Sequence, residues 1–115
     1  MGKEITTASG LKYTITKHGK GEVNPVKGNR VKVHYTGKLL DGQLFDSSIN
    51  RQPFAFNIGL GEVIEGWEEG IMLLKVGDHA TFTIPGHLAY GEDGAGPLIK
   101  ANATLIFEVE LISIK

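Results

Sequence analysis

The residue types that most often carry chemistry do not form a familiar set in this sequence. Its histidines are His18, His34, His79 and His87, and no two of them have the four-residue spacing that places two metal ligands on one helix face. Cysteine is absent, which excludes disulfides, thiolate metal sites and a cysteine nucleophile. The serine-hydrolase motif Gly-x-Ser-x-Gly and the phosphate-binding P-loop are also missing. We therefore expect neither a metal ion nor a nucleotide cofactor.

Carboxylates cluster once. Glu62, Glu65 and Glu69 lie within a single short stretch and could form a carboxylate site. The simpler interpretation is a solvated helix face, because Glu65, Glu68 and Glu69 fall opposite the apolar positions and acidic residues suit the start of a helix.

Aromatic residues form the most unusual set. Its members are spread along the whole chain: Tyr35, Phe45, Phe54, Phe56, Trp67, Tyr90 and Phe107. Filling the core is their ordinary role, and it explains Phe56 and Phe107 at least as well as any other. Trp67 is harder to explain in this way, because it is the single tryptophan and has Gly66 and Gly70 around it. Glycines beside a large ring allow other groups to approach its face.

Most of the elements that must position these rings are strands. Apolar and polar residues alternate with period two over 11–16, 31–36, 54–58, 80–84 and 104–114, which is typical of half-buried strands. His34 and His79 occupy the alternate positions and are expected to face solvent. Asp41-Gly42 between apolar residues predicts a tight hairpin.

One stretch changes period. Val63, Ile64, Trp67, Ile71 and Leu74 recur at spacings of three and four, which predicts one short helix over residues 63–74, ended by a glycine at position 77. A glycine-rich loop over residues 86–103 is too long for a turn, and such loops are often functional. We predict an α+β fold in which an antiparallel sheet packs against this helix.

Composition limits the class of protein. The chain has 115 residues with 12 basic and 13 acidic side chains, so we expect a single domain over 1–115, monomeric, with an extended or flexible segment over 1–9. The charge balance argues against a nucleic-acid partner, and no apolar stretch approaches the roughly 20 residues that span a bilayer. No apolar signal segment follows the amino terminus, which leads us to expect a cytoplasmic protein.

Several blocks in the same order resemble the FK506-binding protein (FKBP) family. They are Val33-His34-Tyr35-Thr36-Gly37, Asp41 to Ser48, Gly61 to Gly70, Ala89-Tyr90-Gly91 and Asn102 to Leu111. The match is collinear from about Gly10 to Ile114. The resemblance implies a curved antiparallel sheet around one helix and the activity of a peptidyl-prolyl cis-trans isomerase, with proline-containing polypeptides as substrates and FK506 or rapamycin as macrolide ligands.

The resemblance also implies a pocket. Its catalytic residues would be Tyr35, Phe45, Asp46, Trp67, Tyr90 and Phe107, and its further binding residues would be Phe54, Val63, Ile64 and Ile99. Trp67 would form the floor and Asp46 would be a buried polar partner. The backbone of Ile64 and the Tyr90 hydroxyl would hydrogen-bond the substrate or the macrolide.

Two departures from the family pattern fall in the long loop. Lys100-Ala101 stands where relatives commonly have two prolines, and Ala95-Gly96 stands where they often have His-Pro. Because proline fixes φ, these changes are expected to loosen the pocket rim and alter substrate preference and drug affinity. The alternative function is a catalytically weak FKBP-like module that binds a protein partner.

Overall fold

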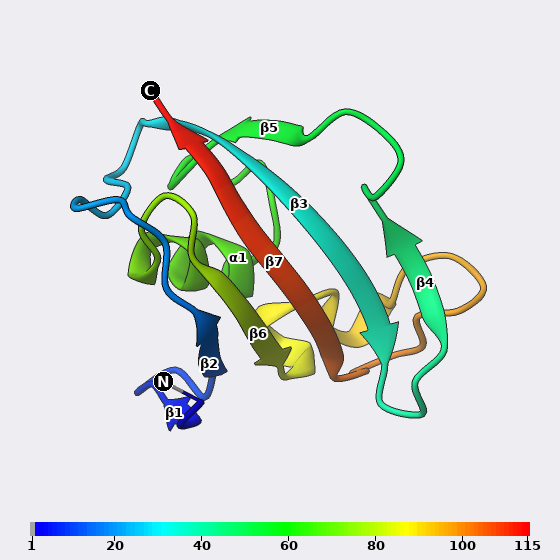
Figure 1. The fold of residues 1–115 in the computed structure, drawn as a ribbon. Coiled ribbons are helices and arrows are strands. Elements are labelled where there is room, and N and C mark those ends of the chain that lie inside the picture. The colour runs from blue at the N-terminus through cyan, green and yellow to red at the C-terminus, as the bar shows by residue number, and fades with distance from the viewer. Residues whose placement is uncertain (1) are drawn as a thin grey trace.

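The computed structural model describes residues 2–115 and contains one antiparallel sheet curved around a short helix (Figure 1). Within this range the only α-helix is α1, Glu65–Gly70, and three short 3₁₀ turns occur later in the chain. The expected α+β class and the wrapped-sheet architecture are confirmed.

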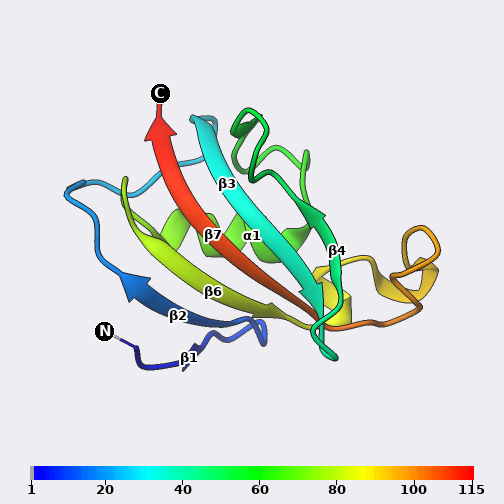
Figure 2. The ribbon, with the colours of Figure 1, turned by 45° about the vertical axis from the view of Figure 1, so that its right-hand side comes forward.

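The sheet is built from strands that are distant in sequence. They lie in the order β1-β2-β6-β7-β3-β4, with β5 also paired to β3, and every pairing is antiparallel. Their bounds are β1 Ile5–Thr6, β2 Lys12–Lys17, β3 Arg30–Leu39, β4 Leu44–Ser47, β5 Phe54–Asn57, β6 His79–Ile84 and β7 Leu105–Ile114. Figure 2 shows β6, β7 and β3 passing side by side across α1.

Alternation along the strands separates the core from the outer face. In β3, Val31 and Val33 are fully buried whereas Arg30 and Lys32 are exposed. The inward residues of β3, β6 and β7 meet those of α1 in one continuous core. Burial of apolar surface at about 25 cal/mol per Å² makes this arrangement the main source of the fold's stability.

The helix is shorter than its apolar period predicts. The α-helix α1 spans only Glu65–Gly70 and passes into a 3₁₀ turn over Ile71–Leu73. Ile64 has φ −60° and ψ 152° and is therefore extended, so the predicted start at Val63 is wrong. The helical end also comes before Gly77, whose φ of +90° serves a later turn.

Gly66 and Gly70 have a different role from the expected one. A Cβ at Gly66 would lie 2.5 Å from Ile84 Cγ2, and one at Gly70 would lie 2.8 Å from Phe82 Cε1. These glycines therefore let α1 pack closely on β6. From the sequence we instead expected them to let other groups approach the face of Trp67.

The long loop over residues 86–103 folds on itself beyond the ends of β3 and β4 (yellow to orange in Figure 2). It contains the 3₁₀ turns Gly86–Leu88 and Gly91–Asp93. Ala95 and Ile99 exchange two backbone hydrogen bonds of 2.8 and 3.2 Å, and Asn102 N–H donates to Gly91 O at 2.7 Å. The loop is thus closed by its own backbone.

The outer-face histidines are only half exposed. His34 Nδ1 lies 2.9 Å from Ser48 Oγ, and His79 Nε2 lies 3.6 Å from a Glu110 carboxylate oxygen. Both rings lie on the outer face as expected, but each faces solvent only in part because Ser48 or Glu110 supplies it with a polar partner.

Candidate active site

An aromatic cavity of about 240 Å³ lies where the curved sheet meets the start of α1. Strands β3, β4, β5 and β7, the segment before α1, α1 itself and the long loop all contribute to it. Its lining residues are Tyr35, Phe45, Asp46, Phe54, Glu62, Val63, Ile64, Trp67, Tyr90 and Phe107. All residues predicted for the pocket line it except Ile99.

Trp67 is the centre of the aromatic packing. Its ring centroid lies 5.0 Å from that of Tyr35 and 5.2 Å from that of Phe107, both in edge-to-face geometry. Phe54 and Phe56 follow at 6.1 and 5.9 Å. Such pairs each contribute about 0.5–1.5 kcal/mol beyond their buried area, so the indole is rigidly held.

The indole nitrogen is an exception to the rule that buried polar atoms are paired. Trp67 is 4% exposed, and its Nε1 has no hydrogen-bond partner among the residues that the structure describes. The indole therefore contributes packing to the cavity and no hydrogen bond to the described residues.

Gly37 makes room for two of the walls. A Cβ at this position would lie 2.7 Å from Phe45 Cζ and 2.8 Å from Phe107 Cε1. These two rings stand 5.5 Å apart at 88°. The glycine of the Tyr-Thr-Gly sequence is thus required where β3 passes beneath them.

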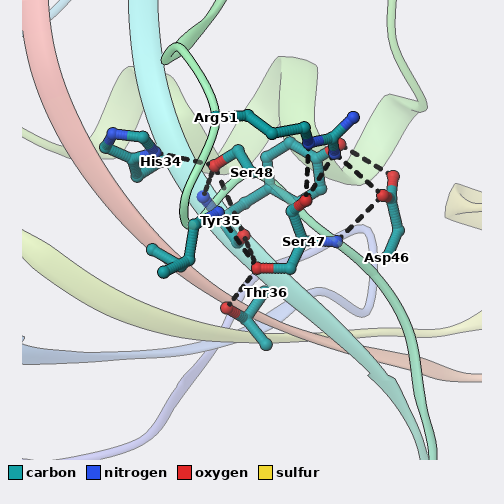
Figure 3. Close-up of polar contacts among 8 residues, drawn as sticks. His34, Tyr35, Thr36, Asp46, Ser47, Ser48 and Arg51 are labelled. Atoms are coloured by element: carbon teal, nitrogen blue, oxygen red, sulfur yellow. Dashed lines mark hydrogen bonds and ion pairs between the residues drawn. The ribbon is translucent and has the colours of Figure 1, made fainter.

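A polar network borders the cavity on one side (Figure 3). The Tyr35 hydroxyl donates to Asp46 Oδ2 at 2.7 Å, and Arg51 Nη2 donates to Asp46 Oδ1 at 3.2 Å. Burial, and then the hydrogen bond to Asp46, raise the pKa of Tyr35 from 10.0 to about 12. The phenol therefore remains a hydrogen-bond donor throughout the physiological pH range.

Asp46 is not the buried group that the family resemblance implied. Its side chain is 48% exposed, because it points away from the core in the alternation of β4. The neighbouring Arg51 and solvent both stabilise its charge. Asp46 therefore orients Tyr35 and Arg51 from the rim of the cavity.

Ser48 fixes the position of Tyr35 from behind (Figure 3). This serine is 2% exposed. Its Oγ accepts the Tyr35 N–H at 2.8 Å and its own N–H donates to Tyr35 O at 2.9 Å. Strand β3 and the segment after β4 are thereby held together next to the cavity.

Two glutamates hold the segment that leads into α1. Asn57 donates to the Glu62 carboxylate through its backbone N–H at 2.9 Å and its side-chain Nδ2 at 3.0 Å. Glu68 accepts the N–H groups of Gly59 at 3.0 Å and Gly61 at 2.8 Å. Glu62 is exposed, as expected for a solvated residue, but it precedes α1, and both Glu62 and Glu68 also hold the backbone of this segment.

Glu62 is the lining residue that sequence reasoning missed. The hydrogen bonds from the Asn57 backbone and then its side chain lower the pKa of Glu62 from its usual value. Glu62 directly precedes Val63 and Ile64 in the sequence, and this position next to two predicted pocket residues could have indicated that it lines the cavity.

Ile99 and Tyr90 mark the limits of the long loop's contribution. Ile99 is 8% exposed and belongs to the core, where its backbone pairing with Ala95 holds the loop. Tyr90 is 41% exposed and stands at the rim. Ile99 is not among the lining residues of the cavity in this structure, so its role in binding stays a prediction.

Only one of the two backbone polar groups of Ile64, its carbonyl, is hydrogen-bonded to the described residues. Its carbonyl accepts the N–H groups of Trp67 at 3.0 Å and Glu68 at 3.1 Å, and its N–H donates to none of residues 2–115. The extended conformation before α1 thus leaves a backbone donor beside the indole.

Within residues 2–115, no three His, Cys, Asp or Glu side chains are grouped so as to hold a metal ion. No helix in this range is both long and apolar enough to cross a bilayer.

Comparisons with known proteins agree with this geometry. Residues 21–112 match the family model described as FKBP-type peptidyl-prolyl cis-trans isomerase. The chain is 51% identical over 107 residues to FK506-binding protein 1 of Dictyostelium discoideum, covering 92% of this chain and 99% of that protein. It is 54% identical over 110 residues to the probable FKBP-type peptidyl-prolyl cis-trans isomerase FkpA of Neisseria meningitidis, covering 95% of this chain but 39% of that longer protein.

A solved structure shows the same fold. The crystal structure of AtFKBP13 superposes with a TM-score of 0.90 at 39% sequence identity, covering 98% of this chain and 99% of that one. From the family match, the identity to full-length relatives and the shared fold, the chain belongs to the FKBP-type peptidyl-prolyl cis-trans isomerase family.

Proposed function

We propose that the cavity binds a peptide with the proline ring seated against Trp67 and catalyses rotation about the preceding X-Pro bond. The observation that supports this mechanism most strongly is the enclosure of one indole by aromatic rings. Prolyl isomerisation breaks no covalent bond, so it requires neither a nucleophile nor a metal ion. It requires a site that stabilises a twisted amide.

Apolar walls can lower this barrier. Rotation about the peptide bond costs about 18–20 kcal/mol because it interrupts amide resonance. The twisted transition state has a less polar carbonyl than the planar ground state. Aromatic walls against the rotating amide therefore disfavour the planar form relative to the twisted one, and each ~1.4 kcal/mol of that difference increases the rate about tenfold.

The polar groups at the rim orient the substrate. In this proposal the Ile64 N–H and the Tyr90 hydroxyl donate hydrogen bonds to the peptide. Asp46 and Arg51 hold Tyr35 against the proline. None of these groups transfers a proton.

The same cavity is proposed to bind macrolides of the FK506 and rapamycin type, since relatives of this chain are named for FK506 binding. Affinity is expected to be lower than in relatives with prolines in the long loop. Gly94 and Gly96 have φ of +62° and +59°, and Lys100-Ala101 supplies no proline ring to restrict the backbone.

The direct test is a protease-coupled isomerisation assay on this chain with an Ala-Leu-Pro-Phe peptide. We expect acceleration proportional to protein concentration and inhibition by FK506. A folded protein that binds FK506 without accelerating isomerisation would favour the alternative, a module that binds protein partners.

A monomeric state, the absence of a nucleic-acid partner and a cytoplasmic location remain proposals. The net charge of −1 supports the second of these proposals, because nucleic-acid binding usually involves an excess of basic residues. Sedimentation analysis, electrophoretic shift with mixed nucleic acid and cell fractionation test them in turn.

A further inference from the structure

Glu62 carries a charge at the cavity and forms no direct ion pair with any of the described residues. The charged lining residues are Asp46 and Glu62, and Asp46 forms an ion pair with Arg51 at 3.2 Å. Among the described residues, no Lys, Arg or His nitrogen forms an ion pair with Glu62. Its partner is Asn57, which is neutral.

The Glu62 carboxylate is also fixed in place. Both of its oxygens accept hydrogen bonds from Asn57, one from the backbone and one from the side chain. Arg30 Nη1 donates to Asn57 Oδ1 at 3.4 Å. After the two hydrogen bonds from Asn57, the charge of Arg30 is a smaller cause that lowers the pKa of Glu62, without a direct ion pair. A fixed, ionised carboxylate costs less ordering entropy on binding a partner than a free side chain does.

Three further carboxylates lie in the segments that contribute lining residues. Glu65 follows the lining residue Ile64, and Glu92 and Asp93 follow Tyr90 by two and three residues. All three side chains belong to exposed residues. With Glu62 and Asp46, these carboxylates outnumber Arg51, the cation that is paired with Asp46 at the rim, and an excess of negative charge attracts cations from solution.

We propose that Glu62 is a specificity-determining residue that favours peptides with a lysine or arginine next to the proline. The inference rests on the isomerase function proposed above. A proline seated on Trp67 places its neighbours' Cα atoms about 3.8 Å along the chain. Long cationic side chains lay their methylene groups along apolar surface and keep the charge in water, so their charged ends can meet the carboxylate at the rim.

The expected effect is moderate, because the pair is exposed to solvent. Exposed ion pairs alter binding by about two- to fivefold. The effect should weaken in high salt, since the screening length falls from about 10 Å at 0.1 M to about 3 Å at 1 M.

The test compares peptides that differ only in charge. Lysine and the uncharged, similarly shaped norleucine are placed before the proline in one peptide pair and after it in a second pair. For each pair the Lys/norleucine ratio of kcat/KM is measured for the native protein and for Glu62→Gln. Any general effect of the substitution on the loop cancels in this ratio.

We expect the ratio to fall about two- to fivefold in Glu62→Gln for at least one peptide pair, and to fall in the native protein at 1 M NaCl. The matched control is Glu4→Gln, which removes the same charge from an exposed residue outside the cavity lining and should leave the ratio unchanged. Equal ratios in native protein and Glu62→Gln for both pairs would overturn the inference. Failure of the native protein to isomerise either norleucine peptide would instead overturn the proposed function on which it rests.

Discussion

Asp46 is the carboxylate best placed to act as a general base, and its replacement separates that role from orientation. Asp46→Leu removes the acceptor of the Tyr35 hydroxyl at 2.7 Å and of Arg51 at 3.2 Å. Because the Asp46 side chain is 48% exposed, water replaces part of what is lost. We take the loss as about one hydrogen bond of roughly 0.5–1.5 kcal/mol, which corresponds to a decrease in kcat/KM of about tenfold or less.

A general base would behave differently. Its removal typically lowers the rate by about 10²–10⁴-fold. The assay is kcat/KM for a proline tetrapeptide with Asp46→Leu and with Asp46→Asn, which keeps the shape and one acceptor oxygen. Circular dichroism and urea unfolding establish that each variant is folded. Near-complete inactivation of folded Asp46→Asn would refute the assignment of this residue to orientation.

The other predictions concern the floor, the helix contact and the phenol. Trp67→Leu should abolish most isomerase activity and macrolide binding, with a loss of stability below the about 3–5 kcal/mol typical of Trp→Ala; unchanged macrolide affinity in a folded variant would remove Trp67 from the site. Gly66→Ala should lower the free energy of unfolding by about 1–3 kcal/mol through overpacking against Ile84; a gain, as helix propensity alone predicts, would contradict the close contact of α1 with β6. The pKa of Tyr35 is raised from 10.0 to about 12 in the folded protein. As pH rises between these values, the phenol loses its proton in the unfolded state before it does so in the folded state, and the free energy of unfolding should decrease. Tyr35→Phe should lack that decrease in urea titrations, and an identical decrease would contradict the shift.

Strand alternation predicted β2, β3, β5, β6 and β7, because one face of each strand packs on the core and the other faces solvent. It did not predict β4, or β1 in the segment 1–9 that was expected to be extended or flexible. The apolar period was less reliable at the start of the helix. Val63 and Ile64 continue the helical spacing, yet Ile64 is extended. These residues are apolar because they line the cavity. A functional surface and a buried helix face therefore give the same sequence pattern here.

Three rim or loop residues differ from their sequence-based description for the same physical reason. Ile99, Asp46 and Glu62 lie in or beside segments whose path is set by tertiary contacts. The bridge to Ala95 directs Ile99 into the core, and Asn57 holds the Glu62 carboxylate. Such hydrogen bonds have no period in sequence, so the family resemblance identified most of the pocket while the geometry of its rim required the structure.

The central claim is that this pocket rotates a peptide bond without moving a proton. The most direct measurement is kcat/KM for a proline peptide in heavy water and in ordinary water, with a protease-free readout such as exchange broadening in NMR spectra. A mechanism without proton transfer should give a kcat/KM that is nearly constant from about pH 6 to 8. We also expect the same kcat/KM in heavy water and in ordinary water. A clearly lower kcat/KM in heavy water at equivalent pH and pD would show that a proton is transferred in the transition state, and it would contradict the mechanism.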